Sequence, residues 1–379
     1  MSVSKSQKPL YSVIKDELQS KIDQGDYQPD QQLPTENELS SLYSVSRITT
    51  RRALEELERE GYIYRIQGSG SFVKRAEAAP ERQTPAPLSF AEVEPGPIIS
   101  MILPHLDEGA MVGYIRGASD YLNRLGYHLS VHTSNSDPAL EEELLESMPG
   151  RGSSAVILYP LNDSCSFERL NRLYLMDFPI VTIDKEMPGM PIPSVVSDNF
   201  GGVYEAVSRL IDLGHRRIAF FSNAAIESVS SVRSRYFGYC KAMKDRGVPI
   251  LPELVRLGAS KELKAAGKTA FFSGLLNGYR ENGITAVQVE NDLIAVQLLL
   301  YAQQLDMRIP DDLSIFGFDN NPICEMLHIP VATVGQNYDE IGRTAAELLI
   351  RRLRQGQAGT GQHVVPVSLI ERKSVHRLA

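Results

Sequence analysis

Apolar side chains recur at helical spacing near the start of the 379-residue chain. They lie three or four residues apart over 9–24, which predicts an amphipathic helix that stops at Gly25. A second helix is predicted to start at the cap Thr35 and run through Leu42, and a third to follow the cap Ser46. Because only a short turn separates the last two, the pattern predicts a helix-turn-helix.

The pattern next changes to the alternation of short strands. Residues 62–66 and 71–73 read as two strands, and the glycine-rich stretch 67–70 reads as the tight turn between them. This hairpin after a helix-turn-helix predicts a wing. The predicted first domain spans residues 1–75.

A proline-rich segment follows, and beyond it the rhythm is different. Residues 76–97 hold five prolines and little to bury, which is typical of a linker that is semi-rigid where proline-rich. From residue 98 onward short apolar runs alternate with helical segments such as 111–125, which predicts parallel sheets covered by helices on both faces. The predicted strands are 98–103, 128–133, 155–159, 180–183, 217–222, 285–289 and 313–318.

A body of this length with so many β-α units is expected to form two lobes. The fold class predicted is therefore α/β with an α+β head: a winged helix-turn-helix followed by a two-lobed, doubly wound parallel-sheet domain over 98–379. The expected lobe boundaries are about 98–196 with 320–348 for the first lobe, and about 197–319 with 349–379 for the second.

Composition narrows the class of protein. With 42% hydrophobic and 23% charged residues the chain is typical of a globular protein, and no apolar run approaches the ~20 residues of a membrane span. The N-terminal residues lack the apolar core of a signal peptide, so we expect a cytoplasmic location. The three cysteines have no ligand-like spacing, which argues against a metal site or disulfides, and no cofactor is expected; they are Cys165, Cys240 and Cys324.

Charge is distributed unevenly. The chain carries a net charge of −8, yet residues 44–75 hold seven basic and four acidic side chains. Arg47, Arg51 and Arg52 lie in the first two turns of the third helix, at the end that favours anions. Cations at that position suit an external anion such as DNA phosphate, although a solvated charged helix remains an equal alternative from these residues alone.

The whole first domain resembles the GntR-type winged helix-turn-helix. The matching motifs are LPTENEL at 33–39, VSRITTRRAL at 45–54, LEREG at 57–61 and QGSGSFV at 67–73. The resemblance implies that Arg47 and Arg51 contact bases and that the turn at Gln67 and Gly68 enters the minor groove. A phosphate loop at the same glycines is a weak alternative, because no helix follows. The full expected DNA-contact set is Thr35, Glu36, Arg47, Thr49, Thr50, Arg51, Arg52, Gln67, Gly68 and Ser69, with Thr35, Thr49 and Arg52 mainly on phosphates.

Acidic side chains follow three of the predicted strands of the body. Asp184, Asp292 and Asp319 each come after an apolar run, where parallel sheets bind their ligands. One such acid is often only a helix cap, but three together define a candidate polar cleft.

The body as a whole resembles the LacI/GalR effector domain with its periplasmic-binding-protein fold. The matching motifs are DN at 198–199 with GG at 201–202, LGHRRIA at 213–219, Arg235 with GY at 238–239, ND at 291–292, and IPDDLSIFGFD at 309–319.

The second resemblance implies a sugar effector. It places Arg235, Asp292 and Asp184 at the effector contacts, and Asp319 completes the candidate set. Carboxylates and a guanidinium suit sugar hydroxyls, since such hydrogen bonds are charge-assisted. The chain departs from the family in having no tryptophan, in lacking an aromatic residue at 257–260, and in the altered run VGQN at 334–337.

A GntR-type head on a LacI/GalR-type body resembles the bacterial arabinose-repressor group. This implies a repressor of carbohydrate-utilisation genes that binds operator DNA as a homodimer and is released by a small sugar such as arabinose. An effector-dependent activator is the alternative within the same class. Two alternatives come from other classes. A sugar-active enzyme is disfavoured because the sequence shows neither a candidate catalytic triad nor paired metal ligands. An exported solute-binding protein is disfavoured because the N-terminal residues lack a signal-peptide core. His215, within LGHRRIA, is expected to be structural.

Overall fold

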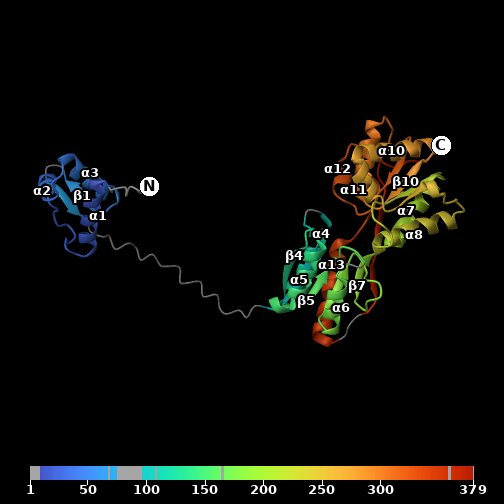
Figure 1. Ribbon diagram of the computed structural model, residues 1–379, viewed down its shortest axis with the longest axis horizontal. Coiled ribbons are helices and arrows are strands. Elements are labelled where there is room, and N and C mark those ends of the chain that lie inside the picture. Colours follow the sequence, from blue (N-terminus) through green and yellow to red (C-terminus); the bar gives the residue numbers. More distant parts are fainter. Residues whose placement is uncertain are drawn as a thin grey trace, which may run out of the picture. The chain divides into compact units, whose positions relative to one another are not determined.

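A computed structural model describes residues 9–66, 69–74, 96–106, 109–163, 166–356 and 360–378. Its contacts divide the chain into two compact units, Met1–Val93 and Glu94–Ala379. Below, the first unit is called the head and the second the body. Figure 1 shows both units and labels many of their helices and strands.

The head is a three-helix domain with a hairpin. Its two strands form the antiparallel hairpin that the sequence predicts, and Ile63 lies opposite Val73. Thr35 closes a full capping box with Glu38, which fixes the start of the second helix. Ser46 caps the third helix by accepting from the Thr49 amide. The elements are α1 (Leu10–Asp23), α2 (Glu36–Leu42), α3 (Arg47–Arg59), β1 (Ile63–Ile66) and β2 (Gly70–Val73).

One apolar cluster holds these head elements together. Ile14 and Leu18 of α1 pack against Leu54 and Leu57 of α3, and all four side chains are buried. Burial of each such side chain stabilises the fold by ~1.5–3 kcal/mol before the loss of chain entropy. The polar face of α3 is thereby turned outward.

The first lobe of the body is built on a six-stranded parallel sheet in the order β13-β7-β6-β5-β3-β4. Helices α4 and α13 cover one face, while α5 and α6 cover the other. The elements are β3 (Ile98–Leu103), α4 (Gly109–Asn123), β4 (His128–Thr133), α5 (Pro138–Ser147), β5 (Ser153–Leu158), α6 (Phe167–Leu175), β6 (Ile180–Ile183), β7 (Ser194–Ser197), α13 (Tyr338–Gln355) and β13 (Gln362–Val365).

The second lobe has a four-stranded parallel sheet in the order β11-β10-β8-β9, and β12 pairs antiparallel with β14 beside it. Both sheets follow the predicted parallel plan, so the α/β fold class is confirmed. The elements are α7 (Asn199–Asp212), β8 (Ile218–Phe221), α8 (Ser230–Asp245), β9 (Val255–Arg256), α9 (Ser260–Ala266), α10 (Lys268–Glu281), β10 (Ala286–Val289), α11 (Asp292–Gln304), β11 (Ser314–Phe316), α12 (Ile323–Met326), β12 (Thr333–Gly335) and β14 (Ser368–Ile370).

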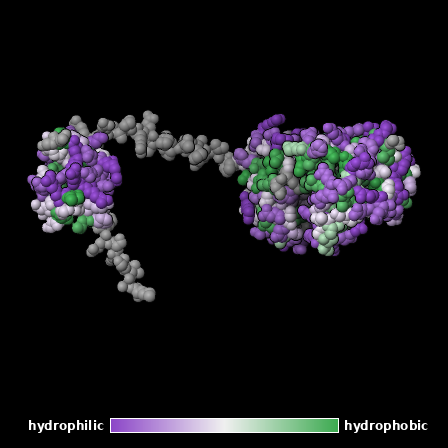
Figure 2. All heavy atoms as spheres, turned by 90° about the horizontal axis from the view of Figure 1, so that it is seen from above, coloured by the Kyte–Doolittle hydropathy of each residue, from purple (hydrophilic) through white to green (hydrophobic). Residues whose placement is uncertain are grey.

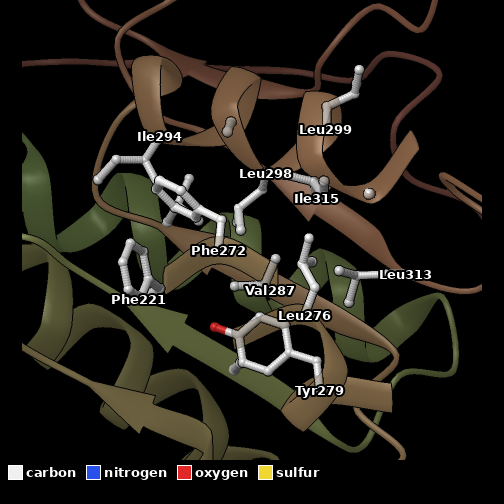
Figure 3. Close-up of a cluster of buried hydrophobic side chains, with 14 of the residues drawn as sticks. Phe221, Phe272, Leu276, Tyr279, Val287, Ile294, Leu298, Leu299, Leu313 and Ile315 are labelled. Carbon is white, nitrogen blue, oxygen red and sulfur yellow. The ribbon is translucent and has the colours of Figure 1, made fainter. Parts of the chain in front are cut away.

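Alternate side chains of the second sheet face two different helix layers. Phe220 packs with α7 and α8, whereas its neighbour Phe221 packs with α10 and α11. Figure 3 shows Phe221, Phe272 and Val287 within the second of these clusters. Because strands buried on both faces are continuous apolar runs, their positions are readily predicted from the sequence.

The chain passes between the lobes three times, from β7 to α7, from β12 to α13 and from β13 to β14. The expected lobe boundaries differ from this arrangement. Residues 323–334 pack in the second lobe, since Cys324, Val331 and Val334 belong to its apolar clusters. Residues 349–365 belong to the first lobe, where β13 pairs with β7.

Within the residues that the structure describes, no helix is both long and apolar enough to span a membrane.

Candidate functional site

The head presents a groove of about 530 Å³ between α2, α3 and the hairpin. Polar and basic side chains dominate its lining, so it suits an anionic ligand such as a nucleic-acid backbone. The residues that line it are Thr35, Glu36, Asn37, Arg47, Arg51, Leu54, Arg65, Ile66, Gly70 and Ser71.

Two expected base-reading arginines lie in this groove and reach into solvent. The side chains of Arg47 and Arg51 are 68% and 64% exposed. Arg47 Nε donates to Glu36 Oε2 over 3.1 Å, and Arg51 Nε donates to Glu55 Oε1 over 3.0 Å. Exposed pairs of this kind are worth at most ~1 kcal/mol, so both guanidinium groups can exchange partners for a base edge.

Burial excludes one member of the expected DNA-contact set. Thr50 has no exposed surface, and its hydroxyl donates within the head to the carbonyl oxygens of Glu36 and Arg47. The structure thus contradicts the expectation that Thr50 contacts DNA. The residue instead ties the start of α3 to the start of α2.

Three further expected DNA-contact residues, Thr49, Arg52 and Ser69, do not line the groove as Arg47 and Arg51 do. Arg52 stacks over the Tyr11 ring at 4.1 Å and does not line the groove. Thr49 is half-buried, with its hydroxyl 2.8 Å from that of Ser46. The Ser69 carbonyl oxygen accepts from Gln32 Nε2. The expected wing-tip contacts Gln67 and Gly68 lie outside the described residues.

The groove also contains residues that sequence reasoning missed. Arg65 of β1 points to Glu36, with Nη2 2.6 Å from Oε1. Asn37 lines the groove one residue after Glu36. Arg65 lies between two of the matching motifs, so the resemblance assigned it no role. Asn37 lies inside a motif, but only the two residues before it were expected to contact DNA.

The body holds a polar, partly open cavity of about 240 Å³ between its lobes. Its lining comes from both lobes and from the segment that leads into α13. Asp184, Arg235 and Asp319 are brought together here, as expected. The lining residues are His105, Ala110, Met111, Tyr114, Tyr159, Asp184, Lys185, Ala224, Val229, Ser231, Val232, Arg235, Glu290, Asn291, Asp319, Gln336 and Tyr338.

Arg235 is the buried cation of the second lobe, with only 5% of its surface exposed. Its Nε donates to Asn199 Oδ1 over 2.8 Å, and its Nη1 donates to the Glu290 carbonyl oxygen. Its guanidinium carbon lies 3.7 Å from the Phe318 ring centroid, and Nη2 lies 3.5 Å from Asp319 Oδ1. These contacts fix the plane of the guanidinium within the cavity.

Asp184 and Lys185 form the charged pair of the first lobe. Lys185 Nζ lies 2.9 Å from Asp184 Oδ2 and 3.8 Å from the Tyr159 ring centroid. Burial alone would raise the pKa of Asp184, but Lys185 and Arg235 outweigh it and leave the pKa below its ordinary value. Asp184 therefore stays ionised and can accept hydrogen bonds from a ligand.

Asp319 behaves in the opposite way. Burial raises its pKa to about 8 despite the nearby Arg235. Its Oδ1 accepts from Gln336 Nε2 over 2.6 Å, and its backbone φ of +118° is unusual for a residue with a side chain. At neutral pH the cavity thus pairs an ionised acid with a protonated one, which can donate as well as accept.

Asp292 does not line the cavity, contrary to the expectation. Its side chain has no exposed surface and accepts from the Thr333 hydroxyl over 2.7 Å and from the Asn321 amide over 2.7 Å. Burial raises its pKa to about 6. The carboxylate instead joins the start of α11 to the segment behind Asp319.

Glu290, two residues earlier, lines the cavity and was missed. Its Oε2 accepts from the Ser222 hydroxyl and from the Ala224 amide. Burial raises its pKa. The family motif covers Asn291 and Asp292 but not Glu290. The one sequence feature that could have identified Glu290 is its position at the end of an apolar run.

Direct contacts join the two lobes near the start of α8. Asp163 of the first lobe donates its amide to the Ser228 carbonyl oxygen over 2.9 Å. Its carboxylate accepts from the Ser230 amide over 2.8 Å and from Arg233 Nη1 over 3.0 Å. The lobes are therefore held together around the cavity.

The cavity can bind a small hydroxylated molecule through ionised, protonated and cationic groups at once. Its volume and its lining of charged and tyrosine side chains suit a sugar, whose hydroxyls both donate and accept. The described residues contain no group of three or more potential metal ligands.

Sequence models of two families match the chain. Residues 10–73 match the bacterial regulatory proteins of the gntR family, and residues 207–375 match the periplasmic binding protein-like domain. These matches confirm the two resemblances that the sequence motifs indicated, to the GntR-type head and to the periplasmic-binding-protein-like body.

Two curated relatives match along nearly the whole chain. The arabinose metabolism transcriptional repressor of Geobacillus stearothermophilus is 31% identical over 354 residues, which are 92% of this chain and 92% of the relative. The protein of the same name from Halalkalibacterium halodurans is 28% identical over 349 residues, covering 91% and 89%.

Solved structures agree on the fold. The transcription regulator CcpA of Lactococcus lactis superposes with a TM-score of 0.65 at 22% identity, covering 74% of this chain and 99% of its own. A complex of the transcriptional regulator CelR with cellobiose gives 0.64 at 21% identity, covering 90% and 100%.

Proposed function

The chain belongs to the family of bacterial arabinose metabolism transcriptional repressors, and from that premise we propose how it works. The head binds operator DNA and represses carbohydrate-utilisation genes. The body binds a small sugar, arabinose or a related one, and this binding releases the DNA. The observation that carries the proposal is the presence of two separate polar sites, an exposed arginine groove in the head and a cavity lined by buried charged side chains in the body.

In the head, Arg47 and Arg51 read base edges from the major groove. An arginine can donate two parallel hydrogen bonds to guanine O6 and N7, and this contact distinguishes guanine from other bases. Contacts to phosphates carry no such sequence information. Thr35 at the α2 cap and Thr49 in the first turn of α3 position the DNA backbone. The polar lining of the groove supports this division of roles.

In the body, Arg235, Asp184 and Asp319 bind sugar hydroxyls. A sugar that contacts both lobes favours their closed arrangement, and closure changes the spacing of the heads in a dimer. The sugar can shift this equilibrium only by the difference in its affinity for the two arrangements. The hydrogen bonds that Asp163 makes across the two lobes then belong to the closed arrangement, which the sugar stabilises.

A homodimer held by the bodies presents two heads to a pseudo-palindromic operator. Figure 2 shows hydrophobic patches on an otherwise largely hydrophilic body surface. Large apolar side chains of the body are exposed, such as Val112 of α4 and Met326 of α12. Light scattering of the full chain tests the dimer, and a monomer at operator-binding concentrations would contradict it.

The experiment that tests the proposed function has two arms. Selection of duplexes from a random library by the purified chain should enrich one pseudo-palindromic sequence. Thermal melting against a panel of sugars should find one that raises the melting temperature, because a ligand of the folded state stabilises it. No enriched sequence would contradict operator binding, and no stabilising sugar would contradict the effector site.

A further inference from the structure

Five charged side chains alternate in sign along the head groove, and four of them line it. Glu36 lies between Arg47 and Arg65, with Oε2 3.1 Å from Arg47 Nε and Oε1 2.6 Å from Arg65 Nη2. Glu55 lies between Arg51 and Arg65, with Oε1 3.0 Å from Arg51 Nε and 4.0 Å from Arg65 Nη1. Arg65 of β1 is therefore the central link between the acids of α2 and α3.

The central arginine differs from the outer two in exposure. The Arg65 side chain is 26% exposed, against 68% for Arg47 and 64% for Arg51. Both of its terminal nitrogens are directed at carboxylates. Its position suits a role toward the two acids, whereas Arg47 and Arg51 are open to an incoming ligand.

Charge balance explains why this link matters. Three guanidinium groups face two carboxylates, so the network carries a net positive charge. Without Arg65 the network would be neutral, and Glu36 and Glu55 would each form an ion pair with one arginine alone, Arg47 and Arg51 respectively. Burial alone would raise the pKa of Glu36, but Arg47 and Arg65 outweigh it and keep the pKa below its ordinary value. Glu36 thus remains a full negative charge in the groove.

We propose that Arg65 is a positioning residue for DNA binding: it neutralises Glu36 and Glu55, so that Arg47 and Arg51 remain free to exchange toward DNA. It acts through the two acids and not by touching the DNA. Unscreened carboxylates at this place would repel phosphates and retain the reading arginines. The inference rests on the proposed function and names a residue that its motifs do not contain.

The test measures the affinity of full-length variants for a random-sequence duplex and for the selected operator at one salt concentration. Arg65→Gln should weaken both roughly tenfold, the effect of about one partly screened charge. Arg65→Lys should restore most of that loss, because it keeps the charge. Glu55→Gln alone should strengthen binding to the random duplex.

Two further variants separate charge shielding from a direct DNA contact and from a role in folding. Arg65→Gln combined with Glu55→Gln regains the net charge, so Arg65→Gln should cost much less affinity in the Glu55→Gln background than in the unmodified chain. Arg59→Gln is the matched control, since it removes the same charge from an exposed pair with Glu56 outside the groove. It should change the affinity far less than Arg65→Gln.

Each outcome has a definite meaning. Unchanged affinity for Arg65→Gln would overturn the inference, provided the unmodified chain binds DNA. A double variant as weak as Arg65→Gln would also overturn it, because Arg65 would then contact DNA directly or serve only to fold the head. Failure of the unmodified chain to bind any duplex would instead contradict the proposed function.

Discussion

The head groove and the body cavity are both built around arginines and carboxylates, yet their environments are opposite. In the head, Arg47 and Arg51 are mostly exposed and each meets a single acid on the surface. In the body, Arg235 is almost wholly buried and is fixed by an amide, a carbonyl and an aromatic ring. The same residue type is therefore loosely held at one site and tightly held at the other.

This difference fits the two roles. A groove that binds a large polyanion needs arginines that can exchange partners. Their ion pairs with protein acids are easily broken there, because water solvates and screens the separated charges. A cavity that selects one small molecule through buried side chains needs groups that are already oriented, because burial makes every unpaired charge costly. Changes in the body should therefore have larger effects than changes in the head.

The largest effect is expected from Arg235→Ala. Removal of the guanidinium leaves Asn199 Oδ1 and the Glu290 carbonyl oxygen without the donor that they share, and each buried acceptor left unpaired costs ~1–3 kcal/mol. The variant should lose the rise in melting temperature caused by the sugar that stabilises the unmodified chain. Its DNA affinity without sugar should be kept. A normal sugar response would contradict the assignment of Arg235.

Arg51→Ala should have an intermediate effect, confined to the head. We expect a loss of roughly 1 to 3 kcal/mol in operator binding, with relaxed specificity at one base pair. The measurement is an operator titration at fixed salt, with sugar-dependent melting as the control. The comparison between sites would be weakened if this variant changed sugar binding, or if its operator affinity were unchanged.

The pKa of Asp319 predicts a smaller, pH-dependent effect. Because its folded pKa of about 8 lies above the ordinary value of 3.8, the folded chain holds a proton that the unfolded chain releases. The contribution of this group to stability therefore falls as the pH rises from about 4 to about 8, and stays constant above that.

Asp319→Asn removes this titration while it keeps the shape of the protonated acid. Without sugar, its advantage in free energy of unfolding over the unmodified chain should grow across that window. We expect about 1 to 2 kcal/mol at pH 8, after allowance for the partial exposure of the side chain. Urea denaturation at several pH values measures it. Parallel pH profiles for the two chains would show that Asp319 is ionised throughout.

The smallest effect is expected from Thr50→Val. Loss of the buried hydroxyl removes its hydrogen bond to the Glu36 carbonyl and should lower the stability of the head by about 0.5 to 1.5 kcal/mol. Operator affinity of the folded head should stay the same. A loss of affinity like that of Arg51→Ala would restore Thr50 to the DNA-contact set.

The head could be predicted closely because its signals are local. The Thr35 capping box and the Ser46 cap each span four residues, and both lie where the sequence places them. The error at Thr50 has a physical reason. The family motif suggested DNA contact, but at 3.6 residues per turn Thr50 lies on the same face of α3 as the buried Leu54 and Leu57.

The body was predicted in its strands but not in its connections. Apolar runs revealed the central strands, whereas β7, β12 and β13 adjoin the crossovers between lobes and depend on pairing with distant segments. The same limit explains the site. Strand ends predicted the acids, but the hydrogen bonds that turn Asp292 inward and leave Glu290 in the cavity come from segments far away in the sequence.

The central claim is that a sugar in the body cavity governs DNA binding by the head. The most direct measurement is the affinity of the full chain for its selected operator with and without the stabilising sugar, by fluorescence anisotropy at fixed salt. We predict that saturating sugar weakens operator binding at least roughly tenfold, and that Arg235→Ala abolishes this change. Sugar binding that leaves the operator affinity unaltered would contradict the claim.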